Sequence, residues 1–147
     1  MQTTSAVGTV LTTLKSGFDS ATTVPVSFGP QRDFDREQIL IGDVTTPAEQ
    51  QWSFLGNQAR EEEFAVNTTV LAMDPQYQSY DDQIGRAFTI FGVLETWLRA
   101  NVDLGLSASY THLRAEVSRV GVQSYPNADG GTPAVQIDFS VKVNARI

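Results

Sequence analysis

The chain has 147 residues, no cysteine, and seventeen Asp and Glu residues against ten Lys and Arg, which gives a formal net charge of −7. This length predicts one domain, residues 1–147, that needs no metal or disulfide to fold. The composition excludes thiol chemistry and cysteine–zinc sites, and an acidic chain without a basic run is unsuited to binding a phosphate backbone tightly. No apolar run approaches the roughly 20 residues that span a bilayer, and the N-terminus lacks the basic region of a signal peptide, so we expect a cytosol-like compartment.

The N-terminal residues predict a first, short amphipathic helix. Its apolar positions follow the three- and four-residue spacing that places side chains on one helix face, and they are Val7, Val10, Leu11, Leu14 and Phe18. Thr3, Thr4 or Ser5 is expected to cap the start of this helix, and Gly17 is expected near its end.

Two short strands are predicted next. Apolar residues alternate from Val24 to Phe28, and Pro25 confines this strand to an edge or to a strand start. The run from Gln38 to Gly42 is short, apolar and consistent with a buried strand.

The stretch from Asp43 to Asn57 is rich in turn-forming residues, yet it contains Trp52 and Phe54. In one interpretation these aromatic residues fold back on the sheet as a satellite of the core. In the other they form a contact surface, because aromatic side chains are favoured at the centres of interfaces.

Three longer segments predict extended strands. Residues from Glu62 to Met73 alternate, with one face made of Phe64, Val66, Thr68, Val70 and Ala72. Ser107 to Val122 also reads as extended. The cleanest alternation runs from Val135 to Val143, where every second residue is apolar, so one face of this strand is expected to be buried and the other to be wet or to contact a partner.

The segment from Ser79 to Asn101 predicts the central helix of the fold, with an apolar stripe made of Ile84, Ala87, Phe88, Phe91, Leu94 and Leu98. Asp81 and Asp82 suit the positive end of the helix dipole. Gly85 and Gly92 each cost roughly 1 kcal/mol relative to Ala, which predicts close approach by another backbone. A turn is expected at Leu104-Gly105. Together the elements predict an α+β domain, in which two helices pack on one face of a mostly antiparallel sheet.

No residue pattern predicts an active site. His112 is the only histidine, no serine lies in a nucleophile elbow, and no glycine-rich stretch fits a phosphate-binding loop. The acidic clusters Glu61–Glu63 and Asp81–Asp82 could hold a divalent cation, but a solvated strand edge and a helix N-terminus explain them more simply. We therefore expect a protein that is not an enzyme, holds no metal or cofactor, and acts through its surfaces.

Three segments resemble tail terminator proteins of long-tailed phages, especially those that infect actinobacteria. The first is Gln51–Phe64, in which Trp, Leu-Gly-Asn, Arg and Glu-Glu-Phe lead into a strand. The second is Leu94–Gly105, which is similar to the family's central helix and its Arg-Ala-Asp-x-x-Leu-Gly turn, with Asn101 and Val102 in place of the usual Asp-Pro. The third is Val135–Arg146, which is similar to the closing strand pattern Val-x-Phe-x-Val-x-Val-x-Ala-Arg.

The resemblance implies a structural virion protein at the head–tail interface, assembled in the host cytoplasm. It implies a ring, usually hexameric, that caps the tail tube and joins it to the head connector or stopper protein, while DNA passes through the hole without specific binding. The candidate interface residues are Trp52, Phe54, Arg60, Glu61, Glu62 and Glu63. Some of the five carboxylates in the two acidic clusters are expected near the lumen or a subunit seam.

Other functions remain open from the residues alone. Another neck component, such as a stopper or connector ring, or the tube protein itself, shares the size and acidity of a terminator. A small ligand-binding or enzymatic domain that uses the Asp and Glu clusters belongs to a different class, and the single histidine argues against it. A cellular binding module with no role in a phage is the third alternative.

Overall fold

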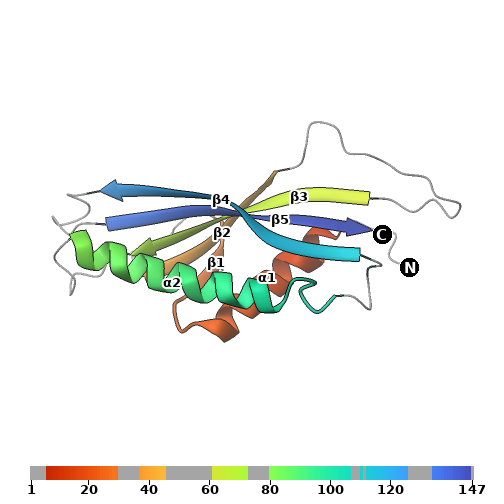
Figure 1. Ribbon diagram of the computed structural model, residues 1–147, viewed down its shortest axis with the longest axis horizontal. Coiled ribbons are helices and arrows are strands. Elements are labelled where there is room, and N and C mark those ends of the chain that lie inside the picture. The colour runs from red at the N-terminus through yellow and green to blue at the C-terminus, as the bar shows by residue number, and fades with distance from the viewer. Residues whose placement is uncertain are drawn as a thin grey trace, which may run out of the picture.

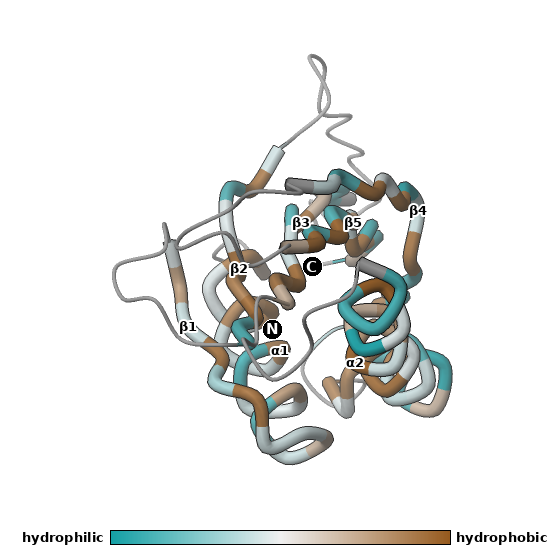
Figure 2. The backbone as a smooth tube through the Cα atoms, turned by 90° about the vertical axis from the view of Figure 1, so that its left-hand side faces the viewer, coloured by the Kyte–Doolittle hydropathy of each residue, from teal (hydrophilic) through white to brown (hydrophobic). Residues whose placement is uncertain are grey.

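The structure is a computed structural model that describes residues 6–29, 37–45, 61–72, 80–106, 110, 112–125 and 134–146. Within these ranges the chain folds as a single α+β domain, with two helices packed against a five-stranded sheet. Figure 1 shows both helices on the same side of the sheet, and the end view in Figure 2 shows the resulting two layers. The predicted fold class is confirmed. No helix in the described ranges is both long and apolar enough to cross a membrane.

The elements are α1 (Val7–Ala21), β1 (Val26–Phe28), β2 (Glu37–Thr45), β3 (Glu61–Ala72), α2 (Tyr80–Ala100), β4 (His112–Tyr125) and β5 (Ala134–Arg146). The strand order in the sheet is β1-β2-β3-β5-β4, and every neighbouring pair is antiparallel except β1 and β2, which are parallel. The last strand therefore lies between β3 and β4. Residues 43–45 belong to β2, so the turn predicted there is wrong for these three positions.

The core lies between the sheet and the helices, where strand alternation places the apolar side chains. The predicted inner face of β3 is confirmed, since Phe64, Val66, Thr68, Val70 and Ala72 are all buried. The inner residues of β5 are buried in the same way, and Figure 1 shows that α2 runs along this part of the sheet. On the other face of β5, Gln136, Asp138, Ser140 and Lys142 are half-buried and Asn144 is exposed. The alternation predicted for β5 is thus confirmed.

Helix α1 follows its predicted apolar spacing but not its predicted ends. Val10, Leu14 and Phe18 are fully buried. The N-cap is Ala6, so capping by Thr3, Thr4 or Ser5 is wrong. Gly17 does not end the helix, which continues to Ala21.

Gly17 instead provides the space for Trp97 of α2. A Cβ atom at Gly17 would lie 2.0 Å from the Trp97 ring, and the ring also packs edge-on against Phe18, with centroids 5.7 Å apart. The close approach that was predicted at Gly85 and Gly92 therefore occurs on the other helix, because no atom lies within 4 Å of an added Cβ at either of those two glycines.

Helix α2 occupies nearly the full predicted segment, and its buried residues include Ala87, Phe91, Leu94 and Leu98. The assignment of Phe88 to the buried stripe is wrong, because its side chain is 42% exposed. The two glycines and Phe88 share the outer face of the helix at spacings of three and four residues. The outer face of α2 thus carries one large apolar side chain beside two open positions.

The predicted turn after α2 is confirmed at Leu104 and Gly105. Both residues have positive φ, at 54° and 70°, and Gly105 can adopt this conformation without the steric cost that a side chain imposes. The turn is held by the Asp103 carboxylate, whose Oδ1 accepts a hydrogen bond from the Gly105 N–H at 2.9 Å. Leu104 is buried, so the turn returns the chain to the sheet with an apolar anchor.

Candidate interaction surfaces

The largest exposed apolar side chains of the sheet lie on its two edge strands. Val120 and Val122 on β4 are 51% and 47% exposed, and Phe28 on β1 is 47% exposed. Scattered apolar residues are normal on a protein surface, but two edge strands that both expose them are candidate association surfaces.

A β-bulge in β4 determines which face of the sheet its valines lie on. The pairing register of β4 with β5 shifts between Val117 and Arg119, so the side-chain alternation changes phase there. Before the bulge, Leu113 and Ala115 are buried. After the bulge, Val120 and Val122 take over the helix-side positions, but they remain half-exposed at the sheet edge.

Sequence reasoning missed this exposed surface, although the sequence contains a signal for it. The apolar residues of the strand change from odd positions, such as Ala115 and Val117, to even positions at Val120 and Val122. Such a change of parity within one extended segment is what a bulge produces.

A groove of about 310 Å³ lies between the second half of α2 and the first half of β4. Two acid–base pairs line it: Arg99 lies 3.3 Å from Glu95, and Arg114 lies 3.7 Å from Glu116. Both arginine side chains are mostly exposed. These charges are largely compensated within the groove, and exposed pairs of this kind contribute little to stability.

The sheet face opposite the helices carries a polar network between β3 and β5. Thr69 Oγ1 donates to Asp138 Oδ1 at 2.8 Å, and Gln136 Nε2 donates to the same oxygen at 2.9 Å. Ser140 Oγ donates to Asn67 Oδ1 at 2.9 Å. The serine therefore bonds an amide and not a base, so this network does not assemble an activated nucleophile.

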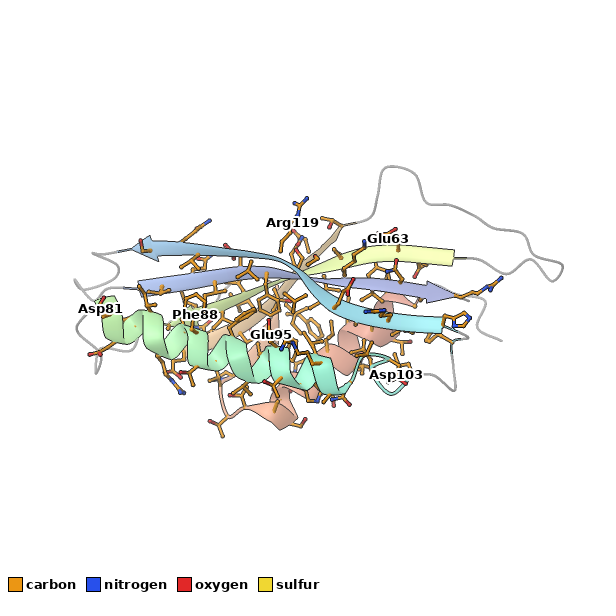
Figure 3. The ribbon with its side chains drawn as sticks, viewed as in Figure 1. Glu63, Asp81, Phe88, Glu95, Asp103 and Arg119 are labelled. Carbon is orange, nitrogen blue, oxygen red and sulfur yellow. The ribbon has the colours of Figure 1, made fainter. Side chains whose placement is uncertain are left out.

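Strand alternation separates the acidic run Glu61–Glu63. Glu62 is buried beneath α1, where its Oε1 accepts a hydrogen bond from the Ala6 N–H at 2.9 Å. This contact supplies the acceptor that the first turn of α1 lacks locally. Glu63 is exposed on the other face, and its carboxylate lies 3.1 Å from Lys142 Nζ. Figure 3 shows Glu63 and Arg119 on the side of the sheet away from the helices.

The other predicted interface residues are described only in part. Trp52, Phe54 and Arg60 lie outside the described residues, and of Glu61 only the backbone in β3 is described. Asp81 and Asp82 are exposed in the first turn of α2, and Figure 3 shows Asp81 at the end of that helix. The structure therefore does not join the two acidic clusters into one site.

No group of three metal-binding side chains occurs among the residues that the structure describes. His112 is exposed at the start of β4, where its register partner is Arg146. The surfaces described above can make contacts, but their polar groups are engaged mainly with one another.

The sequence was also compared with known proteins. No protein-family model matches it, and no curated protein matches it either.

Proposed function

We propose that this chain is a tail terminator protein, a ring-forming subunit that caps the tail tube of a long-tailed phage and joins it to the head connector. The observation that carries this proposal is the resemblance of three segments, in the same order along the chain. Two of these segments correspond to the end of α2 with its turn, and to β5. They are the elements around which the described domain is built.

The departure from the family pattern at Asn101 is compatible with this proposal. Asn101 Nδ2 donates a hydrogen bond to the Trp97 carbonyl oxygen at 2.9 Å, in the last turn of α2. An ionised Asp cannot donate this bond. Asp103 supplies the carboxylate that holds the following turn. In this chain, therefore, Asn101 bonds the last turn of the helix, and the Leu-Gly turn follows it.

The arrangement of surfaces also supports a subunit of an assembly. Within the described residues, β1 pairs only with β2 and β4 pairs only with β5. Among these residues neither edge is covered by a further strand, and each edge exposes apolar side chains. A ring needs two different contact surfaces on each subunit, which these edges can provide.

The acidic character of the chain suits a channel that conducts DNA, because a negative wall repels phosphates. Glu63, Asp81 and Asp82 are exposed carboxylates considered for this role, and Glu63 is paired with Lys142, whereas Glu62 is used inside the domain. Replacing these three residues with Lys is expected to slow DNA ejection from assembled particles. Normal assembly and normal ejection with all three replaced would remove the lumen assignment.

The experiment that tests the function combines native mass spectrometry with negative-stain electron microscopy of the purified protein. We expect a ring with a central hole, which binds at the ends of tail tubes assembled from the tube protein of the same genome. A protein that stays monomeric both alone and with tubes would contradict the proposal.

A genetic test separates the terminator from other neck components. Loss of a terminator is expected to produce overlong or unjoined tails, whereas loss of a stopper produces filled heads that leak DNA. Replacing Trp52 and Phe54 together with Ala is expected to weaken ring formation or tube binding, because aromatic anchors dominate many interfaces. Unchanged binding of rings to tubes, in a variant that folds as the wild type by circular dichroism, would remove these two residues from the interface.

A further inference from the structure

We propose that neighbouring subunits join head to tail by pairing β4 of one copy with β1 of the next, in an antiparallel register that places Val120 opposite Phe28. This inference deepens the proposed function and rests on it, because it assigns the contact that builds the ring. The occupant of each exposed sheet edge is thus a second copy of this chain.

Register partners form rows that cross the sheet, and each row links a residue of the β1 edge to a residue of the β4 edge. The register partners of Phe28 run through Ile41, Thr68 and Phe139 to Val120. The row that begins at Val26 ends in the same way at Val122. In the first row both end residues, Phe28 and Val120, are exposed, whereas in the second row Val122 is exposed and Val26 is buried. An edge-to-edge contact between copies continues these rows without any shift along the strands.

At both edges the backbone N–H and C=O groups of the residues to be paired point outward from the sheet, as pairing with another strand requires. Ile39 N–H donates to the Pro25 carbonyl and Gly29 N–H donates to the Ile41 carbonyl, each at 2.9 Å. In a parallel ladder this leaves the N–H and C=O groups of Val26 and Phe28 pointing away from β2. The same alternation, followed through the sheet, points the backbone groups of Val120 and Val122 outward from β4.

Strand directions select an antiparallel contact. β1 runs parallel to β2, and each of the next three neighbouring pairs is antiparallel, so β4 runs opposite to β1. When copies are placed side by side with the sheet continuous, β4 therefore meets β1 in antiparallel orientation. Val120 then faces Phe28, Gly121 faces Ser27, and Val122 faces Val26.

Charge complementarity favours this contact over a two-fold contact of β4 with itself. The described residues of β1 and β2 contain two acids, Glu37 and Asp43, and no base, whereas β4 contains two arginines and one glutamate. Among the described residues, Arg119 and Asp43 have no salt-bridge partner within the chain. When Val120 lies opposite Phe28, Arg119 lies opposite Gly29 of the next copy. Gly42 and Asp43 follow Ile41, the partner of Phe28 on β2. A β4–β4 contact would leave Asp43 and Phe28 unused.

The bulge in β4 limits the contact to part of the strand. Bulges and charged residues commonly protect edge strands from pairing, and β4 has both at residues 117–119. The segment that follows, which carries Val120, Gly121 and Val122, has neither feature. It runs from Val120 to Tyr125, which is long enough to pair with the three residues of β1.

A disulfide cross-link tests the register, and the absence of native cysteine keeps the result unambiguous. Ser27 and Gly121 are exposed, and no atom lies within 4 Å of a Cβ added at Gly121. In the proposed register they form a non-hydrogen-bonded pair with Cα atoms about 4.5 Å apart, within the span of about 4.4–6.8 Å that a disulfide bridges. The test variant is therefore Ser27→Cys with Gly121→Cys. The matched control is Ser27→Cys with Glu116→Cys, which places the second thiol on the same strand but on the other side of the bulge.

Under mild oxidation, we expect the test variant to form a ladder of covalent oligomers that ends at the ring size, as seen by denaturing gel electrophoresis. The control and the single variants should remain mostly monomeric on the gel. Rings seen by native mass spectrometry without this ladder would overturn the register and leave the ring itself standing. Covalent dimers from Gly121→Cys alone would indicate a two-fold contact of β4 and would also overturn it. Absence of any ring from the wild-type protein would overturn both the proposed function and this contact.

Discussion

The two faces of α2 contain similar residue types but meet different surroundings. On the inner face, Leu94 is fully buried and the Trp97 ring fills the space above Gly17 of α1. On the outer face, Phe88 is 42% exposed, and Gly85 and Gly92 have no neighbouring atom that an added Cβ would meet. A large side chain beside a glycine therefore accompanies tight packing where α2 meets Gly17 of α1, and an open surface on the outer face of α2.

This comparison shows why glycine and aromatic residues do not by themselves identify a packed helix face. In a helix, glycine is destabilising relative to Ala wherever it occurs, unless the missing Cβ makes room for a neighbour. Gly17 makes such room. The contact at Gly17 depends on where the rest of the fold places Trp97, a residue 80 positions later in the chain.

The largest change in stability is expected when apolar packing is removed from the inner face of α2. Leu94→Ala is expected to lower the free energy of unfolding by about 2–5 kcal/mol, because it leaves a cavity in the core. Its neighbour Val93 is 36% exposed, so Val93→Ala is expected to change stability by only about 0.5 kcal/mol. Urea denaturation of both variants measures the difference. Equal losses would show that the two faces are not distinct.

The contact between the helices is tested by Gly17→Ala. The added Cβ would overlap the Trp97 ring, and we expect a loss of about 1–3 kcal/mol from overpacking. Gly8→Ala on the same helix is the control, since no atom lies within 4 Å of its added Cβ. The same denaturation assay applies. An unchanged stability in Gly17→Ala would mean that the helices can separate at no cost.

The two faces of β3 extend the comparison to the sheet. Glu62→Ala removes the buried acceptor of the Ala6 N–H, and we expect it to cost about 1–3 kcal/mol. Glu63→Ala breaks an exposed ion pair with Lys142, for which about 0–1 kcal/mol is expected. Glu62→Gln keeps an acceptor oxygen and should recover part of the loss. Hydrogen exchange at the start of α1 should accelerate in Glu62→Ala. An unaltered exchange rate there would show that Glu62 does not stabilise the start of the helix.

The smallest expected effect is a gain in stability on the outer face of α2. Gly85→Ala and Gly92→Ala should each raise the free energy of unfolding by about 0.5–1 kcal/mol, because Ala has the higher helix propensity and space is available at both positions. Thermal unfolding of the single and double variants measures the gain. A loss of stability at either site would indicate a neighbour that packs there.

Local periodicity was sufficient for much of the fold. The strands β3 and β5 and the helix α2 were predictable because each shows a repeat of two or between three and four over many residues. The turn at Leu104-Gly105 was also predictable, since glycine tolerates positive φ. Parallel pairing of β1 with β2 was not predictable, because the alternation of side chains within a strand does not specify the relative direction of its partner.

The candidate surfaces were less predictable than the fold. Three adjacent glutamates read as one acidic cluster, but the strand places Glu62 on the opposite face from Glu63, where it caps a helix 56 residues earlier in the chain. The helix-side position of Val120 and Val122 depends on a bulge, which the change of parity in the sequence indicated. Trp52 and Phe54 lie outside the described residues, so their assignment as contacts stays a prediction.

The sequence by itself determined which segments become helices and strands and which side of most of them is apolar, because those properties follow from the spacing of side chains along a regular backbone. Only the tertiary structure decided that Phe28 and Val120, the two ends of one cross-strand row, are both exposed. That outcome depends on the order β1-β2-β3-β5-β4 and on the register of each pair. Strand order and register are set by contacts between distant parts of the chain, where burial of apolar surface outweighs local preference.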